Sequence, residues 1–156
     1  MNGKTIGLMV AILIGVLLLF NEQGLIQGGS HRVEGPGGGD TVSAGSGLQA
    51  IADAYRAQRS DVQVMGEGVV KKVLSDDRDG SRHQRFLLRL PNRQTLLVAH
   101  NIDLAPRIDG LREGDRVAFY GEYEWNKQGG VIHWTHHDPG GRHVDGWLEH
   151  RGRTYQ

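Results

Sequence analysis

The hydrophobic pattern of the chain begins with one unbroken apolar run. This run spans 15 residues, from Ile6 to Phe20, and follows the basic residue Lys4. A helix of that length rises only about 22 Å, against a hydrocarbon core of about 30 Å. The length suits a signal-peptide core, but no small-x-small cleavage pattern follows Phe20 closely, which favours an uncleaved anchor over a cleaved signal. Its all-round apolarity argues against a core helix, and the charge bias places Lys4 in the cytoplasm and the rest of the chain outside.

Residues 27–47 form the next region, which is rich in glycine and predicts a flexible linker. Beyond it, apolar residues recur with the 3.6-residue period of a helix, at Leu48, Ile51, Ala52 and Tyr55. The Ser46–Gln49 spacing fits a capping box. We therefore predict a short helix over residues 48–59 that packs on a sheet; binding to a partner protein is the alternative.

From Val62 onward the apolar period changes to two, which is typical of strands. Two glycines in the first strand, Gly66 and Gly68, indicate a bend or bulge. The link over residues 101–115 contains Pro106, which disfavours a long helix, and its apolar anchors are Ile102, Leu104, Ile108 and Leu111. Five short strands are predicted, over residues 62–73, 86–90, 96–99, 117–125 and 131–135.

This pattern predicts a mainly β fold, a small five-stranded OB-like barrel preceded by a short helix and by the N-terminal apolar membrane or signal helix. An SH3-like barrel or an open sheet is the alternative. The predicted organisation is a signal anchor or signal peptide over 1–26, a linker over 27–47, and the helix plus β-domain with a C-terminal tail over 48–156.

Charge and cysteine content narrow the classes of function. The chain has 18 Lys and Arg against 18 Asp and Glu, so its formal net charge is zero. Nonspecific nucleic-acid binders normally carry a basic excess, so the neutral charge argues against that class. The absence of cysteine excludes disulfides, thiol catalysis, cysteine-based zinc sites and lipidation of an N-terminal cysteine.

Histidines near the C-terminus suggest a divalent metal. Five of the eight histidines lie between His133 and His150, and histidine is the commonest metal ligand. A regular strand would hold His133 and His137 about 13 Å apart, so a shared ion requires the chain to leave the strand near Thr135. The predicted metal ligands are His100, His136, His137, Asp138 and His143. The alternative is that these histidines pack a C-terminal tail through bonds to the backbone.

A second group of residues suggests a binding face. If the last two predicted strands pair across the turn at 126–130, Trp125 and Trp134 become neighbours, and aromatics on a barrel face can stack ligands. They can equally fill a core. Glu122 and Glu124 share a strand face, about 6.6 Å apart by strand rise, where they form a solvated face or, alternatively, an acid–base pair. The predicted binding residues are Tyr123, Trp125, His133, Trp134, Arg85 and Arg89.

Three long segments resemble a bacterial family known as a domain of unknown function, number 3465. They are the runs at 100–108, 121–126 and 130–139, together with Gly146-Trp147, and the likeness extends more weakly back to Gly66. The resemblance implies a small exported domain with an OB-like barrel. It implies no reaction, substrate or cofactor.

The best interpretation is a binding module of the bacterial cell envelope, either anchored in the inner membrane through its N-terminal helix or released to the periplasm. The first alternative is a metal-dependent hydrolase in which the C-terminal His/Asp cluster holds the ion and Glu122 or Glu124 activates water. The second is a structural subunit of an envelope assembly.

Overall fold

A computed structural model of the chain describes residues 44–156, and the predicted N-terminal apolar helix lies outside this part. The described part is mainly β, as predicted. Its elements are α2 (Ala44–Arg56), β1 (Val62–Val73), β2 (His83–Arg89), β3 (Thr95–Asn101), β4 (Arg116–Glu124), β5 (Val131–His133), β6 (Trp147–His150) and β7 (Arg153–Tyr155).

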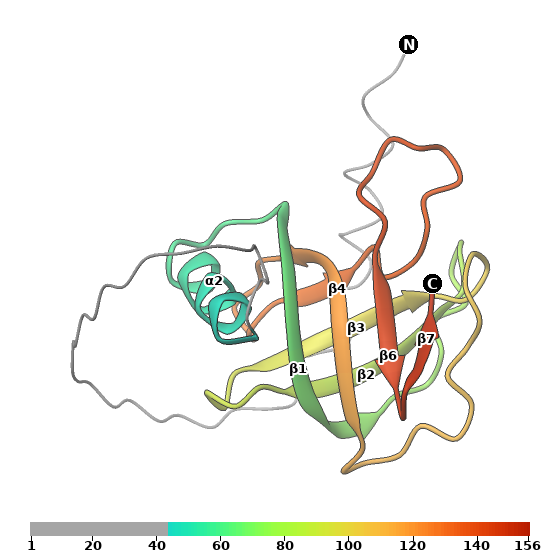
Figure 1. Cartoon of the computed structure of the whole chain (residues 1–156), viewed down its shortest axis with the longest axis horizontal. Helices are drawn as coiled ribbons and strands as arrows, with labels where there is room; N and C mark the ends of the chain where they lie inside the picture. The colour runs from blue at the N-terminus through green and yellow to red at the C-terminus, as the bar shows by residue number, and fades with distance from the viewer. Residues whose placement is uncertain (1–43) are drawn as a thin grey trace. The chain divides into compact units, whose positions relative to one another are not determined.

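Five of the strands close into a barrel, which confirms the predicted number of barrel strands (Figure 1). The order is β1-β2-β3-β5-β4, and β4 pairs back onto β1. The β3–β5 pair is parallel, and the other barrel pairs are antiparallel. The long strand β1 makes the closure possible, because its residues up to Val69 pair with β4 and those from Val69 onward pair with β2. The register slips between Val70 and Lys72, so the irregularity lies beyond the glycines that predicted it.

The inward-facing residues of these strands form the core. Gly66 is needed there, because a Cβ at this position would lie 2.8 Å from the ring of Phe119. Burial of each large apolar side chain contributes roughly 1.5–3 kcal/mol. Fully buried members include Phe86, Leu88, Leu96, Val98, Val117, Phe119, Tyr123 and Ile132.

The helix α2 begins at Ala44, inside the predicted linker and four residues before its predicted start. Ser46 is therefore a helical residue and not the N-cap. The Gln49 side chain donates to Asp53 one turn further on (3.0 Å) instead of closing a capping box.

The C-terminus of α2 is a Schellman motif. Gln58 adopts a left-handed φ of 52°, and the N–H groups of Arg59 and Gln58 donate to the carbonyls of Ala54 and Tyr55 (2.9 and 3.1 Å). The helix packs against β1 and buries Ile51 and Ala54 in the barrel core. This confirms packing on the sheet as the role of its apolar face.

The C-terminal tail contains two strands that were not predicted. The β6–β7 hairpin extends the sheet beyond β4, on the side away from α2 (Figure 1). Leu148 enters the core from β6, and His150 Nε2 lies 2.9 Å from Asp115 Oδ2 at the start of β4. The hairpin therefore pairs with the part of β4 that the short β5 leaves free.

The link between β3 and β4 is irregular, as predicted. Ile108 and Leu111 are buried anchors. The side chain of Gln84, itself buried, bonds both the N–H and the carbonyl of Ile108 (2.9 and 3.0 Å). Leu104 was predicted as an anchor, but 46% of it is exposed, so that prediction was wrong.

Candidate metal centre

Two glutamates of β4 and one histidine of β5 share the outer face of the barrel. Along β4 the buried residues alternate with partly exposed ones, so Tyr123 points into the core and its neighbours Glu122 and Glu124 point outward. The register places Glu122 directly opposite His133 on β5. Directly paired residues point to the same face, so the imidazole lies beside both carboxylates.

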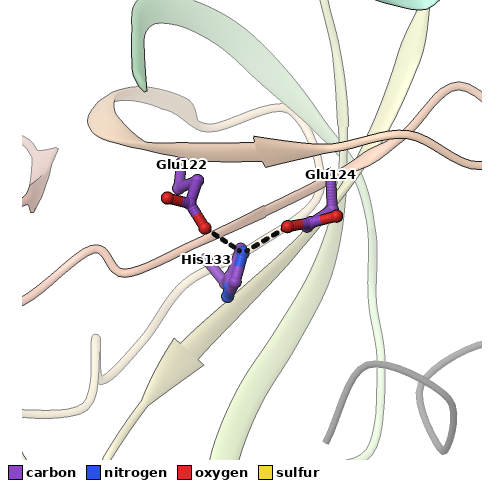
Figure 2. Close-up of side chains that lie close together, drawn as sticks. All are labelled: Glu122, Glu124 and His133. Carbon is purple, nitrogen blue, oxygen red and sulfur yellow. Dashed lines mark ion pairs between the residues drawn. The ribbon is translucent and has the colours of Figure 1, made fainter. Parts of the chain in front are cut away.

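The three side chains converge on one point, as Figure 2 shows. His133 Nε2 lies 3.3 Å from Glu122 Oε1 and 3.7 Å from Glu124 Oε1. One ligand atom from each residue lies within 4.8 Å of the other two. Within residues 44–156, this is the one set of His, Asp and Glu side chains that converges closely enough to hold an ion.

The ring nitrogen of His133 lacks a hydrogen bond despite these short distances. His133 Nε2 is buried, and it makes no hydrogen bond to any described residue. Gln63 of β1 lies opposite Glu122, and its buried Nε2 is also unbonded. Buried polar atoms without partners are uncommon in folded proteins, and each one asks for a physical reason. Two buried nitrogens without a hydrogen-bond partner, beside one pair of carboxylates, indicate that the site can accommodate a further polar group or an ion.

The charged groups of the cluster shift one another's pKa values. Burial lowers the pKa of His133, but the carboxylates of Glu122 and Glu124 outweigh it, so the pKa is raised overall. In return, the interaction with His133 lowers the pKa of both glutamates. Repulsion from Glu124 raises the pKa of Asp61, which precedes β1. A positive charge between these side chains is therefore favoured.

The long loop between β5 and β6 (Figure 1) contributes a second histidine to the cluster. His143 Nε2 lies 2.7 Å from Glu122 Oε2, the oxygen that does not face His133. The Trp134 ring stacks on the His143 ring, with centroids 4.1 Å apart and planes 7° from parallel. Trp134 has a φ of 51°, rare for a tryptophan, and this conformation takes the chain out of β5. The strained turn thus brings a loop imidazole onto the carboxylate pair.

Asp138 holds this loop in shape. Its carboxylate accepts the backbone N–H groups of Gly140, Arg142 and His143 (2.8, 2.7 and 2.9 Å). These bonds lower the pKa of Asp138, the Gly140 bond most of all. Its lone pairs are engaged by the backbone, so Asp138 orders the loop that positions His143.

The structure does not gather the predicted metal ligands into one cluster. His100 lies in the barrel interior, His136 Nδ1 contacts the carbonyl of His137 (2.6 Å), and His137 Nδ1 pairs with Asp145 (2.9 Å) in solvent. Asp138 contacts the backbone, as described above. Only His143, of the predicted set, reaches the glutamate pair.

The predicted binding residues are also dispersed. Tyr123 is fully buried and donates its hydroxyl to the carbonyl of Gly129 (3.1 Å), so it is a core residue. Trp125 packs against the core. Arg85 donates to the carbonyl of Ser75 (3.1 Å), and its side chain is mostly buried. Arg89 is exposed and lines a separate groove. His133 and Trp134 are the two that lie at the metal candidate.

The register of the β4–β5 hairpin differs from the one that the sequence interpretation assumed. The Asn126 side chain accepts the N–H groups of Gln128 and Gly130 (2.9 and 3.0 Å), and Gly129 and Gly130 have φ of 127° and 111°. This turn places Glu124 opposite Val131, whereas pairing Trp125 with Trp134 assumes a different register.

The interpretation of Glu122 and Glu124 as a solvated face was wrong. Their side chains are only 16% and 14% exposed. The alternation of β4 predicted their direction correctly, but it contains no information on the loop that brings His143 onto Glu122. The position of the glycine turn was the signal that could have placed His133 beside them. Counting residues outward from the turn along both strands pairs His133 with Glu122.

The cluster has the donors of a transition-metal site. It presents one imidazole nitrogen and two carboxylate oxygens, a combination that suits zinc, manganese or iron. Magnesium and calcium prefer all-oxygen sites.

Comparison with known protein families identifies the family of this domain. The family described as "protein of unknown function (DUF3465)" matches residues 40–156. The chain belongs to this family. The DUF3465 match covers every strand and the whole candidate centre, and it confirms the resemblance seen in the sequence. No curated protein matches the chain. No helix within residues 44–156 is long and apolar enough to cross a membrane.

Proposed function

We propose that this domain is an OB-type binding module that holds one divalent transition-metal ion between Glu122, Glu124 and His133. The observation that carries the proposal is the position of His133 Nε2. This buried nitrogen lies near two carboxylate oxygens but makes no hydrogen bond.

The distances between the ligand atoms support an ion. Zinc–nitrogen and zinc–oxygen bonds of about 2.0–2.2 Å at tetrahedral angles put neighbouring ligand atoms about 3.4 Å apart. The two observed separations from His133 Nε2 are 3.3 and 3.7 Å. Both separations therefore fit a shared ion, and all three ligand atoms lie within 4.8 Å of one another.

The electrostatics support the same conclusion. Without an ion, Asp61 and Glu124 repel each other, and His133 needs a proton to balance two carboxylates. A divalent cation replaces that proton and relieves the repulsion. His143 contacts the outer oxygen of Glu122 and would fix its orientation, as groups behind metal ligands commonly do.

The proposal concerns binding and assigns no hydrolysis. A water-activating glutamate must remain off the ion, but both Glu122 and Glu124 point at His133 in this arrangement. This assignment differs from the predicted hydrolase, in which the C-terminal His/Asp cluster held the ion and Glu122 or Glu124 activated water. The glutamates become ligands, and His143 supports one of them.

The OB-type assignment is part of the proposal and rests on topology. The closed strand order and the single parallel pair, β3 with β5, support a five-stranded Greek-key barrel of that kind. The envelope location is proposed from the apolar run at residues 6–20 alone. Protease protection in spheroplasts tests it, and a domain that stays protected from added protease would contradict it.

Calorimetry of the full-length, untagged chain tests the metal site. After removal of metals with EDTA, zinc is expected to bind at one equivalent with Kd below about 10 μM, and magnesium far more weakly. The double variant Glu122→Gln/Glu124→Gln should weaken zinc binding at least about 100-fold, because it removes both anionic ligands.

A matched control comes from the loop. His137 and Asp145 form an exposed His–carboxylate pair (2.9 Å), so His137→Gln/Asp145→Asn removes similar groups elsewhere. Zinc binding should survive in this control. Unchanged binding in the glutamate variant, or loss of binding in the loop variant alone, would contradict the proposal.

A further inference from the structure

A second feature of the barrel lies far from the metal candidate. A groove of about 730 Å³ opens between α2, β1 and the turn that joins β2 to β3. Its lining includes Arg116, six residues before Glu122 on β4 and thus about 20 Å away along the strand. The groove is therefore separate from the Glu122–Glu124–His133 cluster.

The β-register sets two arginines across the wall of this groove. Val69 of β1 pairs with Arg89 of β2 on one side and with Arg116 of β4 on the other. The three side chains therefore share one face, with the two arginine Cα atoms about 10 Å apart. Arginine side chains are long enough to converge on one group over Val69.

The lining of the groove is basic although the chain is neutral. It contains four cationic side chains, Lys71, Arg89, Arg93 and Arg116, and one carboxylate, that of Glu67. Arg116 Nη1 pairs with Glu67 at 2.7 Å. The side chains of Arg89 and Arg93 make no ion pair or hydrogen bond within residues 44–156. Two guanidinium groups without a partner among residues 44–156, those of Arg89 and Arg93, thus line one cavity.

Part of the remaining lining is apolar. Leu48 and Ile51 of α2 and Leu90 and Pro91, which follow β2, contribute to it. Arginine pairs with carboxylate or phosphate through two parallel N–H···O bonds, which are stronger than bonds between neutral groups. A ligand that uses the whole groove combines an oxyanion with an apolar portion.

We propose that this groove binds an amphipathic organic anion. Its phosphate or carboxylate lies between Arg89 and Arg116, and its apolar part lies against Leu48, Leu90 and Pro91. This assignment rests on strand pairing, which places Arg89 and Arg116 on either side of Val69 on one face of the sheet. It is independent of metal binding, so EDTA should leave it unchanged.

Calorimetry with octyl phosphate tests the groove, in EDTA and below the concentration at which the probe forms micelles. Binding of one equivalent with Kd below about 100 μM is expected. Octanoate distinguishes a carboxylate ligand from a phosphate ligand. Inorganic phosphate should bind more weakly than octyl phosphate, because it lacks the apolar part, and octyltrimethylammonium should not bind.

The double variant Arg89→Gln/Arg116→Gln should weaken octyl phosphate binding at least about tenfold, because it removes two charge-assisted contacts. The control Arg78→Gln/Arg153→Gln changes the net charge equally at two other exposed arginines and should change Kd less than about twofold.

Amide shifts of the wild-type protein provide a readout that needs no variant, and they should move at Val69, Arg89 and Leu90. Equal binding by both double variants, shifts confined elsewhere, or equal binding of octyltrimethylammonium would overturn the proposal.

Discussion

His100 of β3 and His133 of β5 lie in neighbouring strands, yet they meet opposite environments. His100 is inside the barrel, where Nδ1 contacts the Thr135 hydroxyl (2.8 Å) and Nε2 contacts the Pro106 carbonyl (3.1 Å). His133 is on the outer face, where Nε2 lies beside two carboxylates without a hydrogen bond.

The protonation of the two rings differs accordingly. The Pro106 carbonyl can only accept, so His100 Nε2 carries a proton and Nδ1 accepts from Thr135. Burial lowers the pKa of His100 to about 4, so it is neutral. The carboxylates instead raise the pKa of His133 above its ordinary value. A histidine with both nitrogens hydrogen-bonded supports the fold, whereas one held beside two carboxylates without a hydrogen bond to either is suited to share a cation with them.

The largest effect that separates them is on stability. His100→Ala should lower the free energy of unfolding by about 3 kcal/mol, because it leaves a cavity and removes the partner of the buried Thr135 hydroxyl and of the Pro106 carbonyl. Denaturant unfolding measures the loss, and the exposed control His137→Ala should change it by less than about 0.5 kcal/mol. A loss below about 1 kcal/mol for His100→Ala would show that this ring does not support the core.

For metal affinity we expect the large effect from the His133 variant and not from the His100 variant. His133→Gln should raise the zinc Kd at least about 100-fold, equivalent to about 2.7 kcal/mol, and should change the stability of the metal-free protein by less than about 1 kcal/mol. Calorimetry and denaturation of the same preparation measure both. Equal zinc affinity in His133→Gln and the wild type would remove His133 from the site.

The pH dependence of stability should also run in opposite directions. His100 has a lowered folded pKa of about 4, so its contribution is present above pH 6.5 and is lost as the pH falls toward 4. This group alone should remove about 2 kcal/mol between pH 6.5 and 4.5. His133 has a raised folded pKa, so its contribution is full below pH 6.5 and is lost as the pH rises through that pKa.

The free energy of unfolding of the metal-free wild type, minus that of His100→Gln, gives the contribution of His100 at each pH. The same subtraction with His133→Gln gives the contribution of His133. The first difference should grow from pH 4.5 to 6.5, and the second should shrink above pH 6.5. Two differences with the same slope would contradict the assignment of opposite protonation states.

The smallest effect tests the loop. His143→Asn removes the contact to Glu122 Oε2 and should weaken zinc binding by about tenfold, in the range of changes behind metal ligands. Zinc calorimetry measures it. A loss as large as that of His133→Gln would make His143 a direct ligand and extend the site into the loop.

Local sequence patterns were enough to predict the barrel strands. Period-two alternation and the glycine-rich turns indicated all five, and the link around Pro106 was correctly irregular. The β6–β7 hairpin escaped prediction because its strands have four and three residues and no glycine-rich turn joins them, whereas the equally short β5 follows the turn at 126–130. The start of α2 was misplaced because Gly45 and Gly47 have low helix propensity, yet Gly47 packs closely against the Met65 carbonyl.

The site depended on non-local features. Histidine content drew attention to residues 133–143, but the partner of His133 is set by hairpin register, which the Asn126 side chain and Gly129 and Gly130 decide. The burial of Glu122 depends on a loop closed by Asp138 through three backbone bonds. Neither pairing nor loop closure leaves a periodic signal in the sequence.

Nitrogen NMR of the histidine side chains during a zinc titration tests the central claim most directly. The metal-free full-length protein should show His133 as a protonated ring and His100 as a neutral one near pH 6.5. Zinc should move His133 Nε2 to a metal-bound shift that saturates at one equivalent, with His100 unchanged. A His133 signal that remains protonated with excess zinc would show that the two glutamates hold an imidazolium and no metal.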